Sequence, residues 1–388
     1  METNEQLKII KRGSAEIISE DELRQRIDST FKEKRPLRIK AGFDPTASDL
    51  HLGHTVLLRK LRQFQDLGHQ VIFIIGDFTA RIGDPSGRSQ LRRPLTKQQV
   101  LDYAQTYKQQ VAKILDIDRL EIVFNSSWFE QMRVEDFLKL TVHSTVSQML
   151  ARADFKKRFS QNEDISLLEF MYPLLQGYDS VMVRADLEIG GTDQIFNLLV
   201  GRQIQKDFNQ PPQVVITMPL LEGLDGVQKM SKSYGNYIGI TESAKDMFGK
   251  IMSIPDELMY KYYELLTDVD LNEVASIHPK EAKLRLAQEI VSQYHSLEVA
   301  RNEREEFERV FSQGLIPEDM PTFKLSSPLD ILNLLLESGL VPSKNEARRL
   351  LRQKAVFFEG RVVVNETERI EGPGIIKVGK RRFLKIIL

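Results

Sequence analysis

Two histidines and two lysines are the residues whose types and spacing point most directly to chemistry. His51 and His54 enclose a glycine in the sequence HLGH, and Lys229 and Lys232 belong to the sequence KMSKS, about 175 residues further on. Glycines flank the second motif and favour a mobile loop that carries two ammonium groups. Such groups can neutralise the charge that develops on a leaving pyrophosphate. Together the motifs indicate phosphate chemistry, although each one alone also fits a solvated surface segment.

The first motif lies where a predicted strand gives way to a predicted helix. Residues 37–43 form a short apolar run, and residues 53–67 repeat with helical period. At such a junction backbone N–H groups and the helix dipole can face an anion, and Gly53 would let a nucleotide approach closely. Two histidines could also hold a metal, but no acidic third ligand follows at the spacing of zinc proteases. The junction therefore favours a phosphate site.

A third group of polar residues shares one face of a predicted helix. Tyr172, Gln176 and Asp179 fall at positions i, i+4 and i+7 among apolar neighbours, so they could line a small-molecule pocket. Ordinary amphipathic surface is the alternative. Two glycine-containing segments, 83–88 and 190–194, read by themselves as a Pro/Gly turn and as a loop before a helix N-cap.

The elements that must position these residues alternate between strand and helix. Further apolar runs rich in β-branched residues predict strands at 71–75, 120–124, 187–189 and 214–217. Helical patterns lie near 97–115, within 128–183 and after 191. This alternation predicts a parallel sheet covered on both faces. We therefore expect an α/β fold with a Rossmann-like parallel-sheet catalytic domain over residues 1–235.

The rest of the chain lacks this alternation. Strand signals disappear between about 241 and 313, and prolines at 317, 321 and 328 mark a linker. Two short helices, at 329–336 and 344–353, and a strand-rich basic end follow. We expect an α-helical domain over residues 236–320 and a small α+β domain over residues 329–388.

Composition sets the class of protein. A chain of 388 residues with 41% hydrophobic and 28% charged residues is expected to form two or three globular domains. The absence of cysteine excludes disulfides, thiolate zinc sites and cysteine nucleophiles. The longest apolar run, 71–75, is far shorter than the ~20 residues of a membrane helix, and the N-terminus lacks the layout of a signal peptide. We expect a soluble cytoplasmic protein without a membrane partner.

The net charge of −1 conceals an uneven distribution. Residues 341–388 hold 12 Lys and Arg against five Asp and Glu, a charge of +7, which leaves −8 for the rest of the chain. Lys344, Arg348 and Arg352 recur every fourth residue and Arg349 flanks them, so one helix face presents cations. A solvated helix is the alternative, but the excess charge favours binding to RNA phosphates.

The HLGH and KMSKS sequences, in this order, are the paired motif of class I aminoacyl-tRNA synthetases. With residues 172–179, 83–88 and 190–194 they resemble the bacterial-type tyrosyl-tRNA synthetases, and the resemblance covers essentially the whole chain. It implies activation of L-tyrosine with ATP to tyrosyl-AMP, then transfer to the terminal adenosine of tRNA(Tyr). It also implies a homodimer with a dimerisation insert near 125–165, an anticodon-side helical domain, and a C-terminal alpha-L fold of the ribosomal S-four type.

The resemblance also distributes roles over the residues. Transition-state and phosphate contacts are implied for Thr46, His51, His54, Arg88, Lys229 and Lys232. Contacts with ATP are implied for Asp44, Gly53, Gly191, Asp193, Met230 and Ser231. Contacts with tyrosine are implied for Gly42, Asp84, Tyr172, Gln176, Asp179 and Gln194, and contacts with tRNA for Lys344, Arg348, Arg349 and Arg352. Mg²⁺ is expected to arrive with ATP, and no metal site of the protein is expected.

Two positions depart from the family pattern. Lys40 stands where the family often has a tyrosine that shares the substrate hydroxyl with the residue matching Asp179. Lys40 could donate to the phenol oxygen while Asp179 accepts its proton, or it could point away and leave Asp179 alone. Arg88 stands where a lysine is frequent, which keeps the charge but alters its geometry.

Three other functions fit parts of the sequence. A tryptophanyl-tRNA synthetase shares the paired motif but normally lacks the basic C-terminal module. An RNA-binding protein on a retired synthetase body should have lost the motifs that stand intact here. A small-molecule nucleotidyltransferase would leave the RNA module unexplained.

Overall fold

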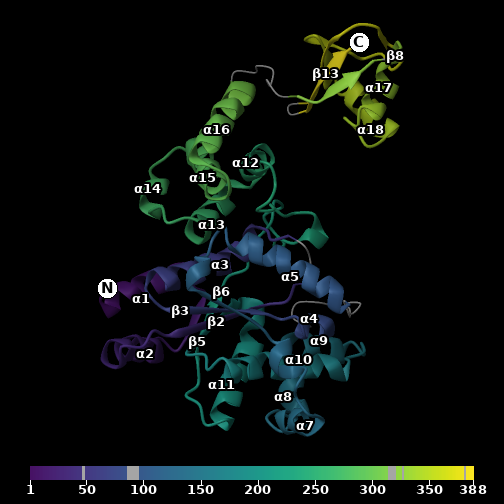
Figure 1. Ribbon diagram of the computed structural model, residues 1–388. Helices are drawn as coiled ribbons and strands as arrows, with labels where there is room; N and C mark the ends of the chain where they lie inside the picture. Colours follow the sequence, from purple (N-terminus) through teal and green to yellow (C-terminus); the bar gives the residue numbers. More distant parts are fainter. Residues whose placement is uncertain (46–48, 85–95, 313–319, 326, 380–381) are drawn as a thin grey trace. The chain divides into compact units, whose positions relative to one another are not determined.

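The structure is a computed structural model that describes residues 1–45, 49–84, 96–312, 320–325, 327–379 and 382–388 (Figure 1). Its contacts divide the chain into two compact units, Met1–Ala300 and Arg301–Leu388. The first unit holds both the strands expected in the catalytic domain and most of the helices expected after it. Each unit is described by itself.

A six-stranded sheet in the order β1-β6-β5-β2-β3-β4 forms the centre of the first unit. Neighbouring strands are parallel, except that β1 pairs antiparallel with β6 at the edge. The strands are β1 (Glu16–Ile18), β2 (Arg38–Phe43), β3 (Gln70–Ile75), β4 (Leu120–Phe124), β5 (Leu187–Gly191) and β6 (Val214–Met218). The sequence predicted all of them except β1, whose three residues are too few for a periodic signal.

Helices cover the sheet, with α3 and α5 on one side and α10 and α11 on the other (Figure 1). The elements are α1 (Thr3–Lys11), α2 (Glu20–Glu33), α3 (Leu52–Asp66), α4 (Thr79–Ile82), α5 (Lys97–Val111), η1 (Ile117–Arg119), α6 (Ser126–Phe129), α7 (Val134–Thr141), α8 (Val146–Leu150), α9 (Ala153–Ser160), α10 (Leu167–Met182), η2 (Thr192–Gln194) and α11 (Ile195–Asp207). The strand order reverses between β2 and β5. In such sheets ligands bind at the carboxyl ends of the two strands that flank this point.

Two glycines let α10 and α11 cross closely beneath this point. A Cβ atom at Gly177 would lie 3.2 Å from the backbone of Gly201 and 2.8 Å from Ile204 Cδ1. Because only glycine has no Cβ, this approach requires it. The crossing brings residues 176–180 of α10 close to the polar side chains that surround α11.

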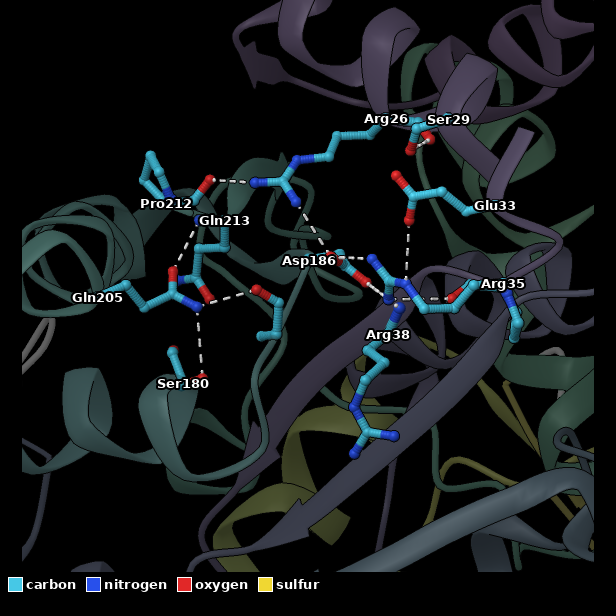
Figure 2. Close-up of polar contacts among 12 residues, drawn as sticks. Arg26, Ser29, Glu33, Arg35, Arg38, Ser180, Asp186, Gln205, Pro212 and Gln213 are labelled. Atoms are coloured by element: carbon cyan, nitrogen blue, oxygen red, sulfur yellow. Dashed lines mark hydrogen bonds and ion pairs between the residues drawn. The ribbon is translucent and has the colours of Figure 1, made fainter. Parts of the chain in front are cut away.

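The amino ends of β2 and β5 are clamped by Asp186, the residue before β5 (Figure 2). Its carboxylate pairs with two nitrogens of Arg35, at 2.7 and 3.1 Å, and with Arg26 of α2 at 3.0 Å. It also accepts a hydrogen bond from the backbone N–H of Arg38 at 2.9 Å. These contacts hold the first residues of both strands in place. They therefore help to set where the residues that follow the two strands lie.

Further helices complete the sequence up to residue 312: α12 (Ala244–Ser253), α13 (Asp256–Leu266), α14 (Leu271–Ala275), α15 (Pro279–Tyr294) and α16 (Leu297–Ser312), after the short η3 (Lys232–Tyr234). Two fully buried tyrosines of α13 donate hydrogen bonds to backbone carbonyls: the Tyr263 hydroxyl to Ala282 O at 2.6 Å and the Tyr262 hydroxyl to Glu222 O at 2.8 Å. Lys261 pairs with the Glu222 side chain at 2.7 Å. Since Glu222 precedes the KMSKS sequence, α13 anchors the base of that loop.

The second unit includes α16 from residue 301 onward and, among the described residues after it, strands and two further helices that share one apolar core. Its elements are β7 (Thr322–Lys324), β8 (Leu329–Asp330), α17 (Ile331–Glu337), α18 (Lys344–Arg352), β9 (Val356–Phe358), β10 (Arg361–Val362), β11 (Arg369–Ile370), β12 (Gly374–Val378) and β13 (Arg382–Ile387). The larger sheet has the order β10-β9-β12-β13-β7. Helix α17 begins two residues later than predicted because Asp330 caps it, accepting from Asn333 N at 2.9 Å.

Candidate active site

A cavity of about 560 Å³ lies at the carboxyl ends of β2 and β5. Its lining joins most of the residues predicted for catalysis, ATP and tyrosine: Gly42, Asp44, His51, Gly53, His54, Asp84, Tyr172, Gln176, Asp179, Gly191, Asp193, Gln194, Lys229, Met230, Ser231 and Lys232. Thr46 and Arg88 lie outside the described residues. Segments far apart in the sequence therefore meet at the edge of the sheet that the strand order predicts.

The HLGH sequence forms the start of α3. His51 is the N-cap residue, and its backbone N–H donates to His54 Nδ1 at 3.2 Å, with the two rings 3.9 Å apart between centroids. Burial lowers the pKa of His51 to about 2, helped by His54 and Lys232. Burial also lowers the pKa of His54 to about 4, with Lys232 adding to the effect. Both rings are therefore neutral at pH 7, so they can offer hydrogen bonds but no positive charge.

Glycine at position 53 keeps the start of this helix open. A Cβ atom there would lie 3.0 Å from the His51 ring and 3.4 Å from Met230 Cβ. The Gly53 N–H points to Met230 Sδ at 3.3 Å, so the backbone at the helix start faces the KMSKS sequence directly.

Backbone hydrogen bonds join the two motifs. Leu52 N–H donates to Ile238 O at 2.9 Å, and Ile240 N–H donates to Leu50 O at 3.1 Å, with His51 opposite Gly239 in an antiparallel bridge. The segment after KMSKS is therefore held against the segment that contains HLGH.

The two KMSKS lysines are paired with carboxylates at the cavity. Lys229 Nζ lies 3.2 Å from Asp193 Oδ2, and Lys232 Nζ lies 2.9 Å from Asp49 Oδ2. Both lysine side chains are about one-third exposed. The ammonium groups are thus close to the cavity, in pairs that solvent screens and that phosphate oxygens could displace.

At the other end of the cavity, Tyr172 and Thr79 both donate to Asp44. Tyr172 OH lies 2.9 Å from Oδ2 and Thr79 Oγ1 lies 2.7 Å from Oδ1. Burial raises the pKa of Tyr172 well above its usual value, and the nearby Asp44 and Asp84 raise it further. The hydroxyl therefore stays protonated. Asp44, for which the resemblance implies ATP contact, here orients a residue of the predicted tyrosine pocket.

Asp179 is held by two side chains that the sequence did not single out. Trp128 Nε1 donates to Oδ1 at 2.9 Å, and Asn125 Nδ2 lies 3.4 Å from Oδ2. Burial raises the pKa of Asp179 to about 7, opposed in part by Lys40 and by these hydrogen bonds. Trp128 is the single tryptophan of the chain, and this was the only feature of the sequence that could have drawn attention to it. Its partner Asp179 lies 51 residues later, and the spacing of residues in the sequence does not predict a contact over that distance.

Lys40 is fully buried behind the cavity lining. Its Nζ lies 2.8 Å from Glu188 Oε1, 2.9 Å from Gln176 O and 2.8 Å from Ser180 Oγ. These three partners use all three donors of the ammonium group. Its position is therefore set by Glu188 and by the backbone of α10.

The remaining predicted residues occupy the strand ends and the second unit. Gln194 Nε2 donates to Asp84 Oδ2 at 2.6 Å. A Cβ atom at Gly191 would lie 2.6 Å from Asp193 Oδ1, so glycine leaves room for the Asp193 carboxylate at the end of β5. The four predicted RNA-binding cations are exposed on α18; Arg348 pairs with Glu366 at 3.0 Å and Arg349 with Glu346 at 2.7 Å.

The residues that the structure describes contain no group of three His, Cys, Asp or Glu side chains arranged to hold a metal ion. Among the helices that the structure describes, none has both the length and the apolar character needed to cross a membrane.

Comparisons with known proteins show the family to which the chain belongs. Residues 32–312 match the family described as tRNA synthetases class I (W and Y). The tyrosine–tRNA ligase of Desulfotalea psychrophila is 52% identical, over 99% of this chain and 98% of the relative. That of Aquifex aeolicus is 54% identical over the full length of both.

Solved structures give the same result. The tyrosyl-tRNA synthetase of Archaeoglobus fulgidus, complexed with L-tyrosine, has a TM-score of 0.64 at 26% identity, covering 78% of this chain and all of that one. A mitochondrial tyrosyl-tRNA synthetase of Coccidioides posadasii shares the fold, with a TM-score of 0.63 at 22% identity, over 77% of this chain and 91% of that one. The chain therefore belongs to the class I tRNA synthetases of the W and Y group, and within it to the bacterial tyrosyl-tRNA synthetases.

Proposed function

We propose that the chain is a tyrosine–tRNA ligase. It activates L-tyrosine with ATP to form tyrosyl-AMP and diphosphate, and then transfers tyrosine to the 3′-terminal adenosine of tRNA(Tyr). The observation that carries this proposal is that one cavity joins the Tyr172–Gln176–Asp179 face to the HLGH and KMSKS motifs. An amino acid held at the first end would direct its carboxylate toward a nucleotide at the second.

The amino-acid end offers acceptors of the right kind. The carboxylate of Asp84 and the side-chain oxygen of Gln176 can accept from a substrate ammonium group, and Tyr172 closes the same face. Asp179, oriented by Trp128, can accept the phenol O–H. Catalysis on this side consists of positioning, since the tyrosine carboxylate itself attacks the α-phosphate and no side-chain nucleophile is needed.

The nucleotide end supplies charge neutralisation. Lys229 and Lys232 can exchange their carboxylate partners for the departing diphosphate, while the neutral His51 and His54 offer hydrogen bonds to the nucleotide. Mg²⁺ belongs to the ATP substrate and shares the phosphate charge. Thr46 and Arg88 keep the phosphate roles that the resemblance implies.

The second unit is proposed to hold the tRNA. Its exposed Lys344, Arg348, Arg349 and Arg352 lie on α18, where they can meet phosphates of the RNA backbone. The α+β core of residues 329–388 is compatible with the alpha-L fold, and the helices after residue 236 are proposed to face the anticodon side.

A homodimer is proposed through the insert at 125–165. Large apolar side chains are exposed there, among them Val134 (77%), Leu138 (57%), Val142 (80%), Val146 (64%) and Phe159 (64%). Several strongly exposed apolar side chains within one short segment are unusual on a monomer, and a second copy of the chain could cover them. We place the protein in the cytoplasm, where ATP and tRNA are available.

ATP–pyrophosphate exchange tests the proposed function. We expect exchange that depends on tyrosine, and aminoacylation of tRNA(Tyr) by the same preparation. Exchange with tryptophan but not with tyrosine would move the assignment to the sister enzyme. RNA binding without any exchange would favour a non-enzymatic role on a synthetase body.

A further inference from the structure

We propose that the buried ion pair of Lys40 and Glu188 positions the ammonium group of the substrate. It does so by fixing the orientation of the side-chain amide of Gln176, that is, which side presents the oxygen and which the nitrogen. The inference rests on the proposed function and deepens it. Lys40 and Glu188 are positioning residues, because they act through Gln176 rather than on the reacting atoms.

The ion pair is enclosed by a complete set of partners. Lys40 and Glu188 are 0% and 1% exposed, and Lys40 places all three donors on Glu188, Ser180 and the Gln176 carbonyl. Glu188 Oε2 accepts from Ser180 Oγ at 3.2 Å and from Gln213 Nε2. A buried ion pair compensates its desolvation only with such partners, so its geometry is closely defined.

This pair decides the orientation of Gln176. A glutamine amide has a donor side and an acceptor side of nearly the same shape, and its surroundings choose between the two. A carboxylate only accepts, so the Gln176 Nε2 that lies 3.2 Å from Glu188 Oε1 must be the donor. The Gln176 Oε1 atom therefore faces the other way, toward Asn197 Nδ2 at 2.9 Å.

A second charged residue enforces the same direction from the opposite end. The nearly buried Arg152 can only donate, and its NH1 lies 3.1 Å from Asn197 Oδ1. This turns Asn197 Nδ2 toward both Gln176 Oε1 and Gln194 Oε1, at 2.9 and 3.0 Å. The hydrogen bonds thus run in one direction from the guanidinium of Arg152 to the carboxylate of Glu188.

The direction matters because an ammonium group has donors and no acceptors. A side-chain carbonyl oxygen has two lone pairs, and Asn197 uses one on Gln176 Oε1, which leaves the other for a ligand in the cavity. A reversed amide would present N–H groups to a cation. A neutral amide at position 188 could accept or donate, so the direction would then depend on Arg152 alone, acting through Asn197, and the productive orientation of Gln176 would be held less firmly.

The test compares ligands that differ only in the ammonium group. For the Glu188→Gln variant we expect about a tenfold higher KM for tyrosine in pyrophosphate exchange and a similar rise in the inhibition constant of tyramine. The inhibition constant of 3-(4-hydroxyphenyl)propanoate, which lacks the ammonium group, should change less than about threefold, as should the KM for ATP. Glu121→Gln is the matched control, at an ion pair with Arg38 in which both side chains are about one-third exposed.

Two further variants keep the inference testable if the single change weakens folding. The double variant Lys40→Met/Glu188→Gln restores charge balance. It should again raise the KM for tyrosine and the inhibition constant of tyramine more than the inhibition constant of 3-(4-hydroxyphenyl)propanoate. In a Gln176→Ala background, Glu188→Gln should add less than about twofold, because its effect passes through Gln176.

Equal losses for tyramine and 3-(4-hydroxyphenyl)propanoate, or a full additional loss in the Gln176→Ala background, would overturn the inference. So would a Glu188→Gln enzyme with unchanged tyrosine KM. Failure of the unmodified protein to exchange with tyrosine would instead overturn the proposed function itself.

Discussion

Lys232 Nζ lies 2.9 Å from Asp49 Oδ2, so the second lysine of KMSKS is paired with a carboxylate of the segment that leads into HLGH. Lys229 is paired with Asp193 in the same way. The two cations that we propose for diphosphate departure are thus each paired with a carboxylate beside the cavity. ATP phosphates carry more charge than either carboxylate and can draw the lysines away.

Removing one of these cations should slow chemistry more than binding. For Lys232→Ala we expect the kcat of pyrophosphate exchange to fall about 100-fold, while the KM for tyrosine stays within about twofold, because the charge acts in the transition state. Asp49→Asn is the matched control: it removes the partner but keeps the lysine, so kcat should stay within about threefold. Equal losses in both variants would mean that the ion pair itself, rather than the free cation, is required.

Asp179 should make the free energy of unfolding depend on pH. Its pKa is about 7 in the folded protein and near 3.8 in the unfolded chain, so folding is coupled to proton uptake. The stability that protonation contributes is fully present below about pH 4 and is lost as the pH rises through 7. The free energy of unfolding can be measured with urea from pH 4.5 to 8. Between pH 4.5 and 7 we expect it to fall more steeply in the unmodified protein than in Asp179→Asn, with a difference in slope of about 1 kcal/mol per pH unit. An identical slope in both proteins would contradict it.

Trp128 should matter for tyrosine and not for ATP. Trp128→Phe keeps the aromatic packing but removes the indole N–H that donates to Asp179 at 2.9 Å. We expect the KM for tyrosine to rise about tenfold, since a hydrogen bond contributes about 0.5–1.5 kcal/mol and a buried acceptor left without its donor costs about 1–3 kcal/mol. The KM for ATP, measured in the same exchange assay, is the internal control. A parallel rise in both constants would indicate a general loss of structure.

The cations of α18 should govern tRNA charging through salt. Lys344→Ala and Arg352→Ala should each weaken tRNA binding and lower the salt-dependence slope by about one, with tyrosine-dependent exchange unchanged. Filter binding at several salt concentrations measures the slope. An unchanged slope would place the RNA contact elsewhere.

Removal of the second unit from residue 320 onward gives a stronger version of that experiment. A cut before residue 341 would split an apolar core that includes Leu335 and Ile376, so the cut belongs before residue 320. The shortened protein should keep pyrophosphate exchange and lose charging. Loss of both activities would show that the first unit depends on the second.

The sequence predicted the sheet because its strands are apolar and separated by helical periods. It also predicted most cavity residues, because they belong to continuous motifs. It did not predict Thr79, Asn125 or Trp128, which act through hydrogen bonds to residues 35 to 54 positions away. Lys40 stayed open for the same reason, since its partner Glu188 lies on another strand, 148 residues later.

The backbone bridge of residues 50–52 with residues 238–240 also has a consequence for synthesis on the ribosome. Among the described residues, the strand-like partner of the HLGH segment emerges only after about 240 residues, although the helix that begins at HLGH can form much earlier. A nascent chain of 200 residues therefore contains most of the tyrosine pocket but neither lysine of KMSKS nor the segment that fastens it. The ability of the domain to catalyse adenylate formation should therefore appear in one late step, when residues 238–240 pair with residues 50–52, and should not increase gradually with chain length.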